Sequence, residues 1–486
     1  MKAANLTAFA LLVVMSFTAM AQDIPYFTTD FPPEEFAARR AKVYDALGAN
    51  GLAVLQGAPS PTGYTRFRQA NEFYYLCGIE VPHAYLLLDG ATRKASVYLL
   101  HRNEARERSE GKLLSAEDAD EVKKLSGLDA VFGIDALAEH LARAARNAGK
   151  QLFTPFQPAE GFAMSRDLAA RAVADYANDP WDQTPAREGS FMLKLRTRFP
   201  QFELRDLSPT LDQLRLIKSQ RELALIRKAT HLACAAIAEA MRSVKPGMYE
   251  HELDGLAKFI YYRNGAQGEA YYSLIASARN AWYPHYNAGK RKMLDGDFLL
   301  FDFAPDVGYY MSDITRMMPV NGKFNAQQRE LYSFYKDAYR AILKAIRPGV
   351  LVSTIQAEAA QEMDTILARS KFSKPIYEQA AKRFVSSYQA SARRGSLGHW
   401  VGMATHDVGN YDNTLRAGMV FTIEPALTVP EEQIYIRMED LVIIHETRAE
   451  IVSDYLPMEM DEIEKVMRED GLLKKYPRLN RTEQQP

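Results

Sequence analysis

The sequence contains little cysteine, no charge bias and no long basic run. Only two of its 486 residues are cysteines, Cys77 and Cys234, and they are far apart along the chain with apolar residues beside them. We therefore expect two buried thiols and a fold that does not depend on disulfides. The formal net charge is −1, so the composition gives no support for nucleic-acid binding through a basic face.

No stretch beyond residue 21 approaches the length of a membrane-spanning helix. The beginning of the chain instead resembles a secretory signal peptide, with Lys2, the apolar run Leu6–Met20, and a small-x-small site that ends at Ala21. No cysteine follows this site, which argues against a lipoprotein. We expect cleavage after Ala21 and a secreted or periplasmic protein without membrane attachment. The alternative is an uncleaved N-terminal anchor.

The remaining length is sufficient for two or three domains with sizeable cores. After a signal peptide at 1–21, strands alternate with helices over residues 22–205, which predicts an α/β domain. Residues 206–470 interleave antiparallel strands with amphipathic helices and predict an α+β domain, followed by a tail at 471–486. The clearest helix start is Ser219, which forms a predicted capping box with the glutamate three residues later.

Two carboxylates in the segment Leu299–Arg316 form the first candidate site. Asp302 ends an apolar run, a turn follows at residues 305–308, and Asp313 lies in a second strand-like run. On a hairpin centred near Val307, the two carboxylates would lie roughly opposite each other on strands about 5 Å apart. Burying them is unfavourable unless a cation lies between them, and a divalent metal ion is the simplest such cation. The alternative is that both face solvent.

More ionisable residues lie in apolar surroundings further along the chain. Glu424 and Glu439 each lie in a strand-like run, where a carboxylate is unexpected unless it is paired or ligating. Glu439 has Arg437 as a potential partner two residues away, whereas Glu424 has no such neighbour. The candidate ligands are Asp302, Asp313, His399, Glu424 and Glu439. This oxygen-rich set suits two divalent ions, with Mn²⁺ favoured and Co²⁺ and Zn²⁺ as alternatives; the ions would supply hydroxide and polarise a carbonyl for amide hydrolysis.

The order of these residues and their flanking sequences resemble the pita-bread metallopeptidases, in particular the Xaa-Pro aminopeptidase (aminopeptidase P) and prolidase type. The segments that carry the resemblance are HYN at His285, DGDFLLFDFA, SDITRMMPVNGKF, GHWVGMATHDVG, LRAGMVFTIEPAL and IRMED. The N-terminal segment FRQANEFYYLCGIEVPHAYLLL also resembles the aminopeptidase P N-terminal domain. The resemblance implies a metallo-aminopeptidase that acts on peptides with proline in the second position, and the predicted signal peptide implies its export.

The resemblance also implies roles for individual residues. Asp302 and His399 would each bind one metal ion, and two carboxylates, Asp313 and Glu439, would bridge both. Glu424 would bind one ion and shuttle a proton from the nucleophilic water. The remaining implied roles concern His285, beside the scissile peptide, His406, a donor to the carbonyl oxygen, and Arg437, which would orient a ligand carboxylate.

One residue departs from the pattern of the proline-specific members. Four residues before His399 these members have a further histidine, and this chain has Gly395. The departure bears on proline preference more than on hydrolysis. The alternatives are a prolidase-like dipeptidase, an aminopeptidase of relaxed specificity, a creatinase-like or methionine aminopeptidase-like enzyme, and a non-catalytic pita-bread binding protein. Homo-oligomer formation is left open.

Overall fold

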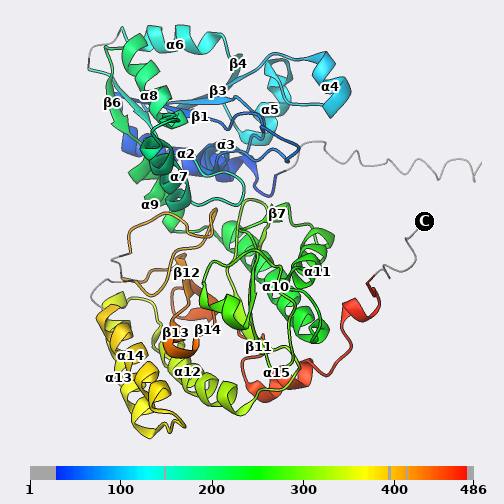
Figure 1. The fold of residues 1–486 in the computed structure, drawn as a ribbon. Coiled ribbons are helices and arrows are strands. Elements are labelled where there is room, and N and C mark those ends of the chain that lie inside the picture. The colour runs from blue at the N-terminus through cyan, green and yellow to red at the C-terminus, as the bar shows by residue number, and fades with distance from the viewer. Residues whose placement is uncertain (1–28, 147–148, 392–395, 412–413, 479–486) are drawn as a thin grey trace, which may run out of the picture.

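The computed structural model describes residues 29–146, 149–391, 396–411 and 414–478. Figure 1 shows two bodies, an N-terminal one built around a single sheet and a larger C-terminal one in which helices surround several short strands. The predicted signal peptide lies outside the described residues. The boundary at residue 205 stays a prediction, although β6 (Glu203–Asp206) is the last strand of the N-terminal sheet.

The N-terminal body is a six-stranded mixed sheet in the order β4-β3-β2-β1-β5-β6. Strand β1 pairs antiparallel with β2 and parallel with β5. Besides β6, its strands are β1 (Gly51–Gln56), β2 (Tyr85–Asp89), β3 (Lys94–Leu99), β4 (Ala130–Gly133) and β5 (Gln151–Thr154). Its helices are α2 (Pro33–Leu47), α3 (Asn71–Cys77), α4 (Glu104–Glu110), α5 (Ala119–Ser126), α6 (Ala136–Ala144), α7 (Arg166–Asn178) and α8 (Arg187–Arg198). This arrangement confirms the predicted α/β class.

Helix α9 (Ser208–Leu216) leads into the C-terminal body, which is α+β as predicted. Its helices are α10 (Gln220–Ser243), α11 (Glu250–Arg263), α12 (Ala326–Ala345), α13 (Val352–Arg369), α14 (Pro375–Ser391) and α15 (Met460–Val466). Figure 1 shows its central strands between α10 and α11 on one side and α12 to α14 on the other.

Its strands pair as β10-β7, β11-β9-β8, β12-β15-β16 and β13-β14. In chain order they are β7 (Gly268–Glu269), β8 (Leu274–Ser277), β9 (Phe298–Asp302), β10 (Pro305–Asp306), β11 (Thr315–Pro319), β12 (Val420–Ile423), β13 (Ala426–Val429), β14 (Ile434–Arg437), β15 (Asp440–Ile444) and β16 (Ala449–Ile451). All the pairings among them are antiparallel.

The predicted capping box at the start of α10 is confirmed. The Ser219 side chain accepts a hydrogen bond from the Glu222 backbone N–H, and the Glu222 carboxylate accepts one from the Ser219 N–H at 2.8 Å. These two bonds satisfy backbone donors that have no partner within the helix. The apolar face of α10 then packs into a hydrophobic core that includes residues of both bodies.

The hairpin that carries Asp302 and Asp313 differs in register from the prediction. Strands β9 and β11 do pair, but Asp302 lies opposite Thr315, and Asp313 precedes β11 by two residues. The connection is longer than a tight turn, because Pro305 and Asp306 pair with β7 and Val307 forms a bridge with Tyr310. The two carboxylates are therefore not partners across a ladder.

The two predicted strands with buried carboxylates are also interrupted. Glu424 lies between β12 and β13, because Pro425 follows it and proline has no N–H to donate to a ladder. Glu439 lies between β14 and β15 and makes one isolated bridge with Thr315. Both carboxylates are thus at breaks in the sheets.

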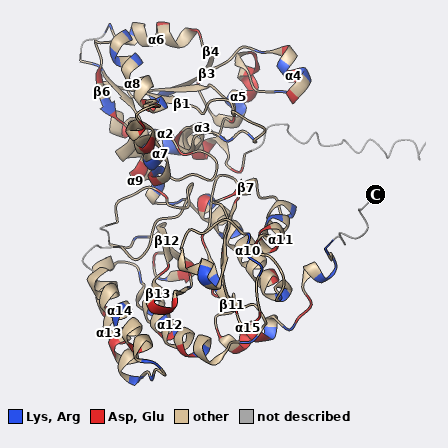
Figure 2. Ribbon diagram, viewed as in Figure 1, with Lys and Arg blue, Asp and Glu red and all other residues tan. Residues whose placement is uncertain are grey.

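Both cysteines are free and buried, as predicted. Figure 2 shows acidic and basic residues interspersed over the helices of both bodies. Among the residues that the structure describes, no helix has the length and apolar character needed to cross a membrane.

Candidate metal centre

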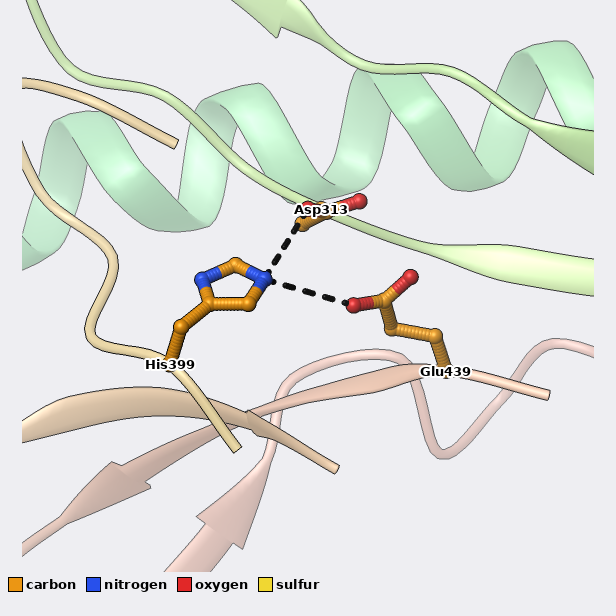
Figure 3. Close-up of side chains that lie close together, drawn as sticks. All are labelled: Asp313, His399 and Glu439. Atoms are coloured by element: carbon orange, nitrogen blue, oxygen red, sulfur yellow. Dashed lines mark ion pairs between the residues drawn. The ribbon is translucent and has the colours of Figure 1, made fainter. Parts of the chain in front are cut away.

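Three predicted ligands from distant parts of the chain converge in the C-terminal body, where their side chains point toward one another (Figure 3). The His399 Nε2 atom is 3.4 Å from Asp313 Oδ2 and 3.8 Å from Glu439 Oε1. All three residues are buried, and one ligand atom from each lies within 4.8 Å of the others. Thr315 positions Glu439 by donating a hydrogen bond to its Oε2 atom at 2.8 Å. This leaves Oε1 facing the histidine.

Tyr271 connects a fourth predicted ligand, Asp302, to this group. Its hydroxyl lies 2.7 Å from Asp302 Oδ1 and 2.6 Å from Asp313 Oδ1, within hydrogen-bond distance of both. The side chain of Tyr271 comes from the segment just before β8. Sequence reasoning did not identify it, because tyrosines in apolar runs are usually core residues.

Arg437 connects the fifth predicted ligand, Glu424, to Asp302. Its guanidinium donates hydrogen bonds to Asp302 Oδ2 and, at 3.2 Å, to Glu424 Oε2. The opposite oxygen of Glu424, Oε1, is 3.4 Å from His399 Nε2. The five predicted ligands and Arg437 therefore form one continuous polar cluster.

The cluster contains more negative than positive charge. Burial and the charge of Asp313 raise the pKa of Asp302 to about 7, although Arg437 acts against this shift. Burial and the charges of neighbouring carboxylates raise the pKa of Glu439 well above its ordinary value. Burial opposes protonation of His399, yet its contacts with Asp313 and Glu424 raise its pKa to about 9. A cation between the carboxylates would relieve this repulsion.

The two further histidines lie at the edge of the cluster. The ring of His406 is 4.2 Å from that of His399, centroid to centroid. Its Nδ1 atom is 3.1 Å from Oδ2 of Asp167, a residue of α7 in the N-terminal body. His285 is exposed. Its pKa is lowered, mainly by partial desolvation and to a smaller extent by the positive charges of Arg437 and His406. Gly395 lies outside the described residues.

Comparison with known proteins identifies the family. The model of metallopeptidase family M24 matches residues 224–446, and that of the aminopeptidase P N-terminal domain matches residues 36–153. The chain belongs to the M24 metallopeptidases. It has the two-part architecture of aminopeptidase P, and its catalytic body is a pita-bread domain. Its enzyme class is that of a metallo-aminopeptidase, a hydrolase.

Three similar proteins show how far the likeness extends. The Xaa-Pro aminopeptidase of Haemophilus influenzae is 27% identical over 465 residues, which cover 91% of this chain and 99% of the relative. The structure of Escherichia coli aminopeptidase P with the inhibitor Pro-Leu is 26% identical, with a TM-score of 0.71 and coverage of 90% and 98%. The Xaa-Pro dipeptidase of Pyrococcus furiosus is 31% identical over 252 residues, covering 51% of this chain and 66% of the relative.

M24 metallopeptidases bind divalent metals, and the donors in this chain fit such ions. Four carboxylates and one imidazole are the ligand types that hard or borderline divalent cations prefer. Oε1 of Glu439 is buried and has no hydrogen-bond partner among the described residues, and it faces His399 across the centre of the cluster. An orphaned buried carboxylate oxygen is costly without a cation.

Proposed function

We propose that this M24 metallopeptidase is an exported Xaa-Pro aminopeptidase, which removes the first residue of a peptide when the second is proline. The observation that carries the proposal is the convergence of the five predicted ligands on one buried, oxygen-rich cluster. The likeness to Xaa-Pro aminopeptidases over both domains supports the substrate class, since the likeness to the dipeptidase covers only half of the chain.

The cluster would hold two divalent ions, with Mn²⁺ the favoured metal because four of its five donors are carboxylates. Asp302 and His399 are proposed as ligands of one ion each, and Asp313, Glu424 and Glu439 as the remaining ligands. When bound, such a pair of ions supplies a hydroxide near neutral pH and polarises a carbonyl oxygen.

The protein side chains complete the proposed reaction. Glu424 is the least buried of the five ligands, and we assign to it the transfer of a proton from the attacking water to the leaving amine. His406 would donate a hydrogen bond to the carbonyl oxygen as negative charge develops there. His285 would lie beside the scissile peptide. Arg437 would keep Asp302 and Glu424 in place through its two hydrogen bonds.

Digestion of three peptide series by metal-loaded enzyme tests the activity and its specificity. Xaa-Pro-Yaa, Xaa-Pro and Xaa-Ala-Yaa peptides are incubated separately with Mn²⁺, Co²⁺ or Zn²⁺ enzyme. We expect cleavage of Xaa-Pro-Yaa well above the other two. Equal cleavage of Xaa-Ala-Yaa contradicts proline specificity, and preferred cleavage of Xaa-Pro indicates the dipeptidase. An enzyme that binds no divalent metal and cleaves none of the peptides is the non-catalytic alternative.

The specificity test has a second arm at Gly395, which stands where proline-specific members have histidine. Gly395→His is expected to raise the ratio of kcat/KM for Xaa-Pro-Yaa over Xaa-Ala-Yaa if the glycine relaxes the specificity. An unchanged ratio contradicts this account. Export is tested separately, by cell fractionation and N-terminal sequencing of the mature protein, which we expect to begin at Gln22.

A further inference from the structure

A residue of the N-terminal domain contacts a proposed catalytic histidine. Asp167 lies in the first turn of α7, and its Oδ2 atom is 3.1 Å from Nδ1 of His406 in the catalytic domain. Figure 1 shows α7 at the face of the N-terminal domain that meets the catalytic domain. The two residues are 239 positions apart in the sequence, so no local pattern links them.

Asp167 is held so that one oxygen faces the histidine. Ser165, which precedes α7, donates a hydrogen bond from Oγ to Oδ1 of Asp167 at 2.6 Å. Oδ2 is then the atom left for His406. Burial acts against ionisation, but the hydrogen bonds from Ser165 and His406 keep the pKa of Asp167 below its usual value. The carboxylate is therefore an acceptor at this position.

The residues next to Asp167 and His406 are joined by a chain of buried ion pairs. Arg166 Nε is 3.4 Å from Glu160 Oε1, and the other oxygen of Glu160 is 2.7 Å from Arg215 Nη2. The same Arg215 nitrogen is 2.5 Å from Asp407 Oδ1. Glu160, Arg215 and Asp407 are each at most 5% exposed. The first turn of α7 and the segment that carries His406 are thus fixed relative to each other.

The N-terminal domain also holds the backbone of this catalytic segment. Asn71 donates a hydrogen bond from Nδ2 to the carbonyl oxygen of Met403 at 2.9 Å, and Arg68 donates one to the same oxygen at 3.3 Å. The contact between Asp167 and His406 is partly exposed, with 48% and 39% of the side-chain surface accessible. It is nevertheless formed between two rigidly held segments, so it costs little conformational entropy.

We propose that Asp167 is a positioning residue for His406, a conclusion that rests on the proposed function. The hydrogen bond at Nδ1 fixes the plane of the imidazole and leaves Nε2 as the ring nitrogen available to a substrate at the metal centre. A hydrogen bond to one ring nitrogen sets the orientation of the other in many catalytic and metal-binding histidines. The N-terminal domain thereby contributes to the active site of its own chain.

Kinetics of three variants test this role. Asp167→Ala is expected to lower kcat for Xaa-Pro-Yaa about 10- to 100-fold, the range for loss of an orienting partner, with KM within about twofold of the wild type. Asp167→Asn retains one acceptor oxygen, which can face His406 if the amide NH2 donates to Ser165 Oγ, and is expected to recover part of kcat. Asp175→Ala removes an exposed aspartate from the same helix and is the matched control, expected to match the wild type.

A rise in KM with unchanged kcat overturns the proposal, because it indicates a charge that binds substrate. The double variant with His406→Ala provides a further test. If Asp167 acts through His406, adding Asp167→Ala to His406→Ala costs no further activity. A multiplied loss shows an independent role and also overturns the proposal.

A structural readout separates this proposal from the proposed function. Crystal structures of the wild type and Asp167→Ala show the orientation of the His406 ring whether or not the enzyme cleaves peptides. We expect a single ring orientation in the wild type and a rotated or multiply oriented ring in Asp167→Ala. An unchanged ring in the variant overturns the positioning role, whereas lack of peptide cleavage by the wild type contradicts the proposed function alone.

Discussion

At the scale of single residues, each of the four proposed carboxylate ligands is held by a neighbour that is not itself a ligand. Thr315 holds Glu439, and Tyr271 holds the two aspartates. Arg437 connects Asp302 with Glu424. Such partners keep donor atoms oriented toward the metal position, and their loss typically costs 10–100-fold in metal affinity or activity.

Tyr271→Phe tests this arrangement, since it removes one hydroxyl and retains the ring. We expect the variant to bind Mn²⁺ about 10- to 100-fold more weakly, because Asp302 and Asp313 lose their shared donor. Calorimetric titration of metal-free protein measures the change. Tyr272→Phe is the matched control, because Tyr272 is 48% exposed and next in the chain. Equal affinities in all three proteins would contradict a role for the hydroxyl.

Glu424→Ala tests the proposed proton transfer. We expect kcat to fall by a factor of about 10² to 10⁴, the usual contribution of general acid–base catalysis, or more if the metal ligand is also lost. The fold should persist because the Glu424 side chain is 28% exposed, and the circular dichroism spectrum and melting temperature check this. The exposed Glu446→Ala serves as the control. Activity retained in Glu424→Ala rules out the assigned role.

The sequence allowed the ligand residues to be predicted, because carboxylates in apolar runs need a specific explanation. It gave no comparable signal for Tyr271 or Asp167. A tyrosine is an ordinary core residue, and an aspartate in the first turn of a helix is common because it interacts favourably with the helix dipole. Their roles arise from contacts across the fold, which residue types and local spacing do not report.

At the scale of secondary structure, the catalytic domain begins with a helix whose start is specified locally. Ser219→Ala removes the side-chain acceptor of the α10 capping box and is expected to destabilise the protein by about 1 kcal/mol. Urea unfolding followed by circular dichroism measures this loss. Ser219→Thr keeps a hydroxyl and should retain most of the stability. If Ala and Thr variants unfold at the same urea concentration as the wild type, the cap contributes nothing measurable.

The helices and strands could be predicted where the sequence signal is local. The prediction was wrong where the structure depends on which strands pair. The capping box of Ser219 and the alternation of the N-terminal domain are local patterns. The register that places Asp302 opposite Thr315 depends on the pairing of Pro305 and Asp306 with β7, a strand about forty residues earlier. Pro425 was a usable local signal, because proline lacks the N–H that a continuous strand through Glu424 requires.

At the scale of the whole molecule, the two domains are joined by a buried charged network in addition to a shared apolar core. Arg215, on the connecting helix α9, lies at its centre, between Glu160 of the N-terminal domain and Asp407 of the catalytic domain. The sequence could not predict this network, because its members are up to about 250 positions apart and each is an ordinary surface residue by type.

Arg215→Met removes the central cation and leaves Glu160 and Asp407 buried without it. Losing one partner of a buried ion pair typically costs 3–5 kcal/mol, so we expect a clear fall in the thermal unfolding midpoint. Asp407 is next to His406, so residual folded protein should also lose kcat. Arg347→Met is the control, because Arg347 pairs with Glu358 on the surface, where both side chains are 45% exposed, and its removal should leave the midpoint unchanged.

A compensated variant separates the contribution of the network to stability from its contribution to the orientation of the active site. In Arg215→Met combined with Glu160→Gln, the charge of Glu160 is removed and Asp407 keeps its buried partner Lys218, so stability should recover in part. Activity should remain low even so, because the hydrogen bonds by which Arg215 joins Asp407, next to His406, to Glu160 of the N-terminal domain are still missing. Recovery of both stability and kcat would mean that the network stabilises the fold without orienting the active site.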